Sequence, residues 1–180
     1  MKSLLLFGTL IFGLTSCGGS IEKVLSLDAS ITLNEKEAEL AELSYQHTEK
    51  TIQQMESFID FTRDFKAMHQ GVEEVDFTPL DAEMKNLNEH ISKGVKLSNK
   101  LIKKINKRKA ELSKEDKYIV SDLYLYERGQ EDFNECYYWI WDAKNDEFEQ
   151  RMTYLMRRMS KARFYMVRYQ WVLEELTLLK

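Results

Sequence analysis

Apolar side chains recur along most of this chain at alternating steps of three and four residues. That spacing is typical of the buried face of an α-helix. Four stretches show it, and none shows convincing strand-like alternation. They run over residues 38–62, 80–105, 119–140 and 148–176. The 180 residues include only one proline and seven glycines, so the interiors of these stretches are almost free of helix breakers. The pattern predicts an all-α protein built from long helices.

Capping residues set the starts of two of these helices. Asn34 is followed three residues later by Glu37, and Ser113 is followed at the same distance by Asp116. This spacing predicts a capping box, in which each side chain binds the backbone amide of the other residue. We therefore expect helices to begin just after Asn34 and just after Ser113.

The connection between the first two helices carries its own signals. Apolar residues widen the face of the first helix as far as Met68, and Gly71 follows soon after, so we predict Gly71 as a left-handed cap. Thr78 stands directly before Pro79, which predicts a helix with Thr78 as N-cap and proline in the first turn. Gly94 lies on the buried seam of the second helix, where a missing side chain permits close helix approach.

The end of the third helix is the weakest point of the pattern. No glycine or proline follows Gly129, so residues 114–178 could form one very long helix in a three-helix arrangement. We favour a turn near Asn145, because helices of more than 60 residues are rare in globular domains. The expected fold is then an antiparallel up-down-up-down four-helix bundle.

The distribution of charged residues supports an antiparallel pairing of the first two helices. The first half of the first helix, residues 35–49, is acidic, and the last half of the second, residues 93–109, is basic. An antiparallel pair places these halves side by side, which would explain the basic run structurally. The alternative is that the basic run binds an anionic partner such as phospholipid head groups or an envelope polyanion. The net charge of −4 argues against a general nucleic-acid binder.

The first residues have the layout of an export signal. Lys2 precedes an apolar core over residues 4–14, which is too short to span a bilayer, and small residues follow. The sequence Leu14-Thr15-Ser16-Cys17 then resembles the lipobox of bacterial lipoproteins. That resemblance implies cleavage before Cys17, fatty acyl groups such as palmitate on Cys17, and anchorage in a membrane of the cell envelope.

The same resemblance divides the chain into three parts. Residues 1–16 would be a cleaved signal peptide, residues 17–33 a lipidated cysteine with a tether, and residues 34–180 the helical bundle domain. Position 18 is glycine, and residues 18–21 hold no acidic cluster. By resemblance to lipoprotein sorting signals, we expect the protein to be anchored at the periplasmic face of the outer membrane, in a host that has two membranes.

The sequence carries no motif for a particular reaction, metal or cofactor. His47, His69 and His90 lack the Glu three residues earlier that a carboxylate-bridged metal site in a bundle needs. There is no Cys-x-x-Cys and no glycine-rich phosphate loop. The methionines that recur every seven residues are read as core, with haem ligation as the alternative; they are Met152, Met159 and Met166.

Cys136 is the only other cysteine, so lipid on Cys17 would leave it without a disulfide partner. An exposed thiol is a liability in an oxidising compartment, and we therefore expect Cys136 to be buried. A role as nucleophile would need a nearby base, and no histidine lies in the C-terminal half of the chain.

Aromatic residues are dense in the second half and cannot all lie on one seam. Exposed tryptophan and arginine are typical of protein-interface hot spots. The candidate partner contacts are Trp139, Trp141, Trp171, Arg157 and Arg158. We expect a non-enzymatic, lipid-anchored module that binds or scaffolds another envelope protein. The alternative is a carrier with a small molecule or cofactor in a bundle cavity, and an enzyme comes third.

Overall fold

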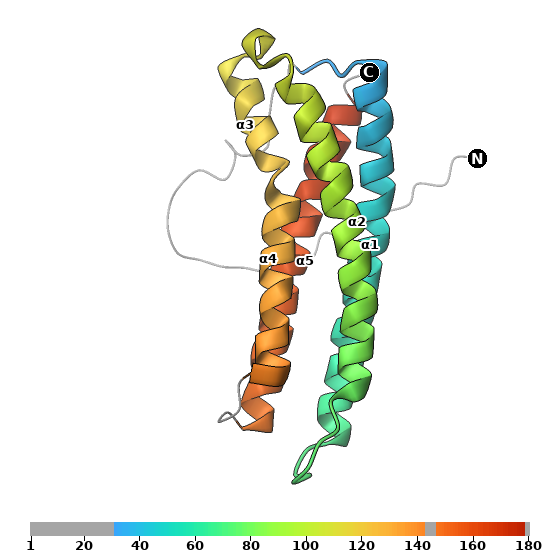
Figure 1. The fold of residues 1–180 in the computed structure, drawn as a ribbon, viewed down its shortest axis with the longest axis vertical. Coiled ribbons are helices and arrows are strands. Elements are labelled where there is room, and N and C mark those ends of the chain that lie inside the picture. The colour runs from blue at the N-terminus through green and yellow to red at the C-terminus, as the bar shows by residue number, and fades with distance from the viewer. Residues whose placement is uncertain (1–30, 143–146, 179–180) are drawn as a thin grey trace, which may run out of the picture.

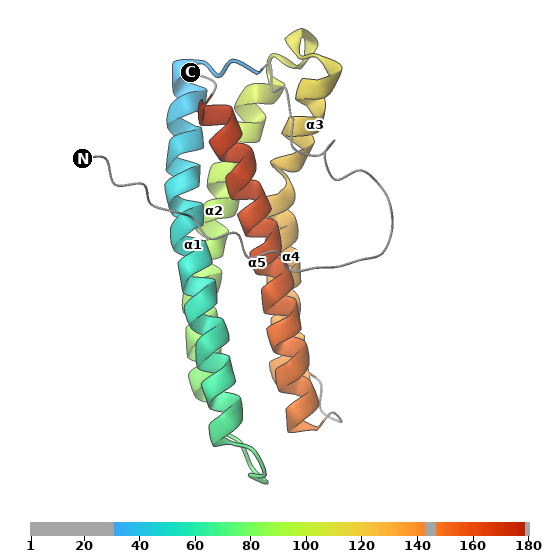
Figure 2. The same cartoon turned by 180° about the vertical axis from the view of Figure 1, so that it is seen from behind.

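The computed structural model describes residues 31–142 and 147–178, and these form an antiparallel bundle of four helical rods (Figures 1 and 2). The first two rods are α1 (Glu35–Met68) and α2 (Thr78–Asn106). The third consists of α3 (Lys114–Asp122), α4 (Leu125–Tyr137) and a terminal π-helical turn, η3 (Tyr138–Asp142). The fourth is α5 (Phe148–Leu178), and a short 3₁₀ turn, η2 (Lys109–Glu111), follows α2. The described residues contain no strand.

Each rod packs against the one before it, and α5 closes the bundle against α1. Because α4 and α5 lie side by side, the chain reverses direction after residue 142. The expected up-down-up-down arrangement is confirmed, and the alternative of one helix over residues 114–178 is wrong. The turn itself, expected near Asn145, lies outside the described residues.

Both predicted capping boxes are present. The Oδ1 atom of Asn34 accepts from the backbone amide of Glu37 at 3.1 Å, and Glu37 Oε2 accepts from the amide of Asn34 at 3.0 Å. At the start of α3 the corresponding distances are 3.0 Å to Ser113 Oγ and 2.9 Å to Asp116 Oδ2. These bonds satisfy amides that would otherwise lack a partner in the first helical turn.

The α1–α2 connection differs from the expectation at both of its ends. Helix α1 ends at Met68 with His69 as cap, and Gly71 has the predicted positive φ of 79° but lies two residues beyond that cap. Thr78 is the first residue of α2 rather than its N-cap, so that prediction is wrong. The reason is local: the Thr78 amide donates to Asp76 Oδ1 at 2.9 Å, so Thr78 already belongs to the first turn, and Phe77 occupies the N-cap position without a side-chain cap hydrogen bond.

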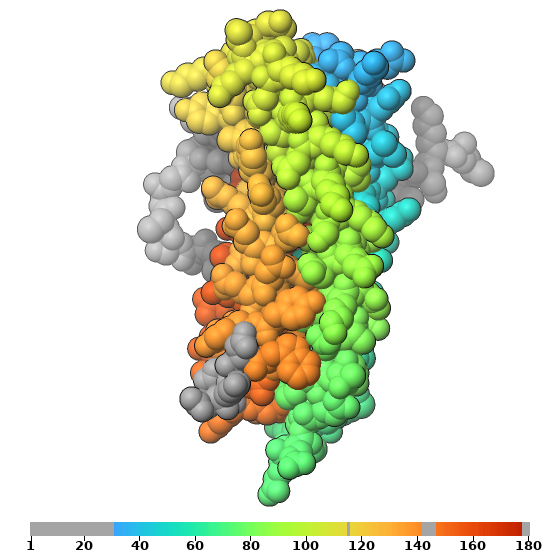
Figure 3. Space-filling model, in the orientation of Figure 1, coloured from blue at the N-terminus to red at the C-terminus, as the bar shows by residue number. Residues whose placement is uncertain are grey.

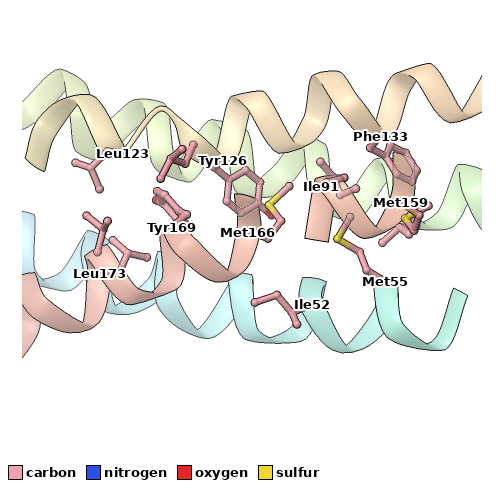
Figure 4. Packing of buried hydrophobic residues seen from close by; sticks show 14 of the residues in the cluster. Ile52, Met55, Ile91, Leu123, Tyr126, Phe133, Met159, Met166, Tyr169 and Leu173 are labelled. Carbon is pink, nitrogen blue, oxygen red and sulfur yellow. The ribbon is translucent and has the colours of Figure 1, made fainter. Parts of the chain in front are cut away.

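The bundle core contains the seams expected from the apolar spacing (Figure 4). All eight predicted seam positions of α2, from Leu80 to Ile105, are buried, and so are eight of the nine predicted on α5. The ninth, Phe148 at the start of α5, is half-buried. The pattern of apolar residues therefore identified which face of each helix points inward.

Hydrogen-bonded hydroxyl groups cross the middle of this core. Ser44 Oγ lies 2.6 Å from Tyr169 Oη, and Thr51 Oγ1 lies 3.1 Å from Tyr126 Oη. The two tyrosine rings meet edge to face, with centroids 5.1 Å apart. Tyr126 also occupies the space beside Gly94, where a Cβ atom would lie 2.0 Å from the phenol oxygen. These contacts join all four rods at one level.

The third rod is interrupted between α3 and α4, which the sequence did not indicate. The amide of Tyr124 binds the carbonyl of Ser121 at 3.2 Å, which tightens the chain locally. The carbonyl of Leu123 accepts from the hydroxyl of Ser98, on α2, at 2.9 Å. A tertiary contact therefore satisfies a backbone group at the break, where neither glycine nor proline is present.

Candidate partner-binding surfaces

The three tryptophans proposed as partner contacts lie on two separate surfaces. Trp139 and Trp141 belong to η3, at the end of the third rod, while Trp171 lies near the other end of α5 (Figure 1). Trp139 stacks on Tyr154 with ring centroids 4.3 Å apart. Seventeen residues of α5 separate Tyr154 from Trp171, or about 25 Å at the helical rise. One compact contact cannot include all three tryptophans.

The first surface, here called the aromatic end, is built by Phe65 of α1, Phe77 of the α1–α2 connection, Trp141 of η3 and Phe148 of α5. Trp141 is 47% exposed and meets Phe77 edge to face at 6.5 Å. Its indole nitrogen donates to Asp81 Oδ1 at 3.2 Å. The guanidinium of Arg151 lies 4.4 Å from the centre of the Phe77 ring, a cation–π geometry. These interactions give Trp141 a structural role at the aromatic end of the bundle.

The second surface runs along α5 and is here called the α5 stripe. It comprises five residues at steps of four and three, which lie on the face of α5 turned away from the core: Arg157, Lys161, Phe164, Arg168 and Trp171. Phe164 is 53% exposed and Trp171 is 59% exposed. Helix α5 lies towards the viewer in Figure 2. Aromatic and cationic side chains therefore share one exposed helix face.

The sequence prediction found only part of the α5 stripe. It named Trp171 and Arg157 but missed Phe164, because it considered aromatic density rather than spacing. The signal was available, since these residues repeat at the helical period between the positions of the buried seam. The guanidinium of Arg168 lies 5.9 Å from the centre of the Phe164 ring.

Arg158, the remaining predicted contact, faces α4. It forms ion pairs with the buried Asp132 at 3.0 Å and with Glu135 at 2.8 Å. Lys161 also reaches Asp132, at 2.9 Å. These pairs join α4 to α5, and they make Arg158 a packing residue of the bundle rather than a free cation.

A third surface lies where the start of α1 meets the end of α2. A groove of about 460 Å³, here called the lysine groove, is lined by Leu40, Glu39 and five lysines: Lys36, Lys100, Lys103, Lys104 and Lys107. The two oppositely charged helix halves are adjacent, as expected. Among the described residues, however, the only ion pair between them joins Arg108 to Glu37, at 2.7 Å. Within the described residues no ion pair involves a groove lysine, and one carboxylate, that of Glu39, lies in the groove wall beside the five lysines.

Cys136 is buried, as expected, and it forms no disulfide. Its Sγ atom lies 3.8 Å from the carbonyl oxygen of Asp132. Burial raises the pKa of the Cys136 thiol strongly, because the thiolate would lose its hydration. This environment opposes the nucleophile hypothesis, since catalysis requires the thiolate.

Two of the histidines form a stacked pair between α1 and α2. The rings of His47 and His90 are 4.1 Å apart, and His47 Nε2 lies 2.8 Å from the carbonyl oxygen of His90. Desolvation lowers the pKa of His90. The described residues contain no group of three or more His, Cys, Asp or Glu side chains placed to hold a metal ion. The three methionines at seven-residue spacing, Met152, Met159 and Met166, are all buried in the core.

Within the part of the chain that the structure describes, no helix has both the length and the apolarity needed to cross a membrane. The chain matches no protein-family model, and neither a curated protein nor a solved structure shows significant similarity to it.

Proposed function

We propose that this chain is a bacterial lipoprotein that binds or scaffolds another envelope protein and catalyses no reaction. Its attachment would be the acylated Cys17, and its place the periplasmic face of the outer membrane. The export signal and the lipobox-like Leu14-Thr15-Ser16-Cys17 support the anchoring part of the proposal. They lie outside the described residues, so this part depends on the sequence alone.

The α5 stripe is the observation that carries the binding part. Phe164 and Trp171 leave more than half of their large side chains exposed, and Arg168 lies between them on the same helix face. Tryptophan and arginine are enriched among the residues that dominate protein-protein binding energy. A helix face of this composition suits a partner that contributes apolar contacts and carboxylates.

The alternative, a carrier with a ligand inside the bundle, has no comparable support. Tyr126, Tyr169 and Met166 fill the middle of the core, and the two tyrosine hydroxyls are engaged by Thr51 and Ser44 (Figure 4). The lysine groove is open and lies at the surface between two helices. A binding surface on the outside of a filled bundle therefore fits these contacts better than an internal ligand.

Site-specific photo-crosslinking in the native host tests the binding proposal. A photoreactive residue replaces Trp171 in one strain and Tyr118 in another, since these side chains are 59% and 61% exposed. We expect a discrete protein adduct from position 171 that disappears when Phe164→Ala and Arg168→Ala are added. No adduct from position 171, or the same adduct from both positions, would refute the use of the α5 stripe.

The anchoring proposal has a separate test. Cys17→Ser should move the protein from the membrane fraction to the soluble fraction or leave it as an uncleaved precursor, while the bundle stays folded. Wild-type protein recovered in the soluble fraction would refute the lipid anchor without affecting the crosslinking result.

A further inference from the structure

We infer that the lysine groove binds the anionic phospholipid head groups of the membrane that carries the anchor. The inference extends the proposed function, because its geometry assumes attachment at Cys17. It assigns a second membrane contact to the folded domain itself, made by side chains rather than by acyl chains.

The charge of the groove is the first argument. Lys100, Lys103, Lys104 and Lys107 follow one another at steps of three, one and three residues, so their ammonium groups project from neighbouring positions on one side of α2. Like charges at such spacing repel one another and destabilise a helix. No described carboxylate forms an ion pair with any of them. An anionic ligand in the groove would relieve this repulsion.

The position of the groove is the second argument. The buried Ile31 is the first described residue, and the carbonyl of Thr32 accepts from Arg108 at 2.7 Å. The chain therefore enters the bundle at the end that holds the lysines, seen at the top of Figure 3 in blue and yellow-green. Fourteen residue steps from Cys17 to Ile31 span at most about 50 Å even when fully extended. Attachment at Cys17 would therefore hold this end of the bundle within about 50 Å of the lipid.

Apolar contacts beside the lysines are the third argument. Leu40 forms part of the groove wall, and Leu43, which lies on the same side of α1, is 54% exposed. Lysine stems are themselves apolar, and they extend along a surface while their charged ends meet phosphate. Ammonium groups around leucines suit the boundary between head groups and acyl chains. A soluble polyanion would make no use of Leu43.

The expected binding energy follows from the number of lysines. A lysine at an anionic membrane surface strengthens binding about fivefold, so removing three should weaken it roughly 100-fold. The effect should fall with added salt, because exposed charges are screened over about 10 Å at 0.1 M ionic strength. Both quantities can be measured without the lipid anchor.

Vesicle sedimentation of the chain beginning at Gly18 provides the test. Every described element and contact lies within residues 31–178, so this start removes none of them. One vesicle set contains phosphatidylcholine alone, and in the other about a third of the lipid is phosphatidylglycerol. The test variant carries Lys100→Gln, Lys103→Gln and Lys107→Gln. The control carries Lys50→Gln, Arg63→Gln and Arg128→Gln, which remove the same charge from exposed positions elsewhere.

We expect salt-sensitive binding to the phosphatidylglycerol vesicles alone, a loss of about 100-fold in the test variant, and a much smaller loss in the control. Circular dichroism establishes that both variants are folded. Equal losses in the two variants, equal binding to both vesicle types, or binding of soluble polyphosphate without vesicle binding would each overturn the inference. Because this protein has no acyl chain, failure here leaves the Cys17 anchor and the α5 stripe untouched.

Discussion

Replacing Gly94 with alanine should destabilise the bundle, although alanine is the better helix former. The new Cβ would lie 2.0 Å from Oη and 2.2 Å from Cζ of Tyr126, whose ring is fully buried. Real Cβ atoms do not approach other atoms so closely, so the ring must move. Its movement would strain the contact with Tyr169 and the hydrogen bond to Thr51.

The expected magnitude combines three effects. Overpacking of a filled core costs about 1–3 kcal/mol, and loss of one buried hydrogen bond costs about 1 kcal/mol. The higher helix propensity of alanine offsets about 0.8–1.0 kcal/mol of this destabilisation. The free energy of unfolding should therefore fall by about 1–3 kcal/mol, which lowers Tm by roughly 2–4 °C for each kcal/mol. Urea unfolding followed by circular dichroism measures this change.

Gly129→Ala is the matched control, because it makes the same change in a buried glycine on another helix. Its Cβ would lie 2.8 Å from the terminal methyl of Met166, which can rotate away, and 3.2 Å from the Ala162 carbonyl. We expect a change smaller than that at Gly94. In a Tyr126→Leu background, Gly94→Ala should become neutral or stabilising. A stabilising Gly94→Ala in the wild-type background would refute the packing described here.

The remaining predictions concern titration, an ion pair and a thiol. Desolvation lowers the pKa of His90, so the imidazole binds a proton more readily in the unfolded chain than in the folded one. The free energy of unfolding should therefore fall as pH drops below about 6.5. Urea titrations should show a smaller fall in the His90→Gln variant. Arg108→Met leaves Glu37 buried without its ion pair and should cost about 1–3 kcal/mol, whereas an unchanged urea midpoint would contradict that pairing. Cys136 should react with a thiol reagent only as fast as the bundle opens, so rapid labelling of folded protein would contradict its burial.

Apolar spacing and capping boxes predicted the fold because both are local. Asn34 with Glu37 and Ser113 with Asp116 need no information from the rest of the chain. The break before α4 was missed because it involves Ser98, on a different helix. Thr78 is a different case, because Asp76, the side chain that binds its amide, is only two residues away in the sequence.

The candidate surfaces were less predictable than the helices. The sequence prediction assigned five tryptophan and arginine residues to one contact, but in the structure they lie on separate surfaces formed by η3 and α5. Arg158 is instead engaged in an ion pair with Asp132. The charge pattern correctly paired α1 with α2. It did not reveal that, among the described residues, only Arg108 and Glu37 form an ion pair between these two helix halves, because ion pairing depends on side-chain reach across the helix interface.

The mass of the intact protein purified from host membranes reports on the proposed attachment through Cys17. We expect a chain that begins at Cys17 and carries the added mass of fatty acyl groups, which fragmentation assigns to that residue. A chain that still begins at Met1, or one that begins near residue 17 without any acyl group, would contradict it.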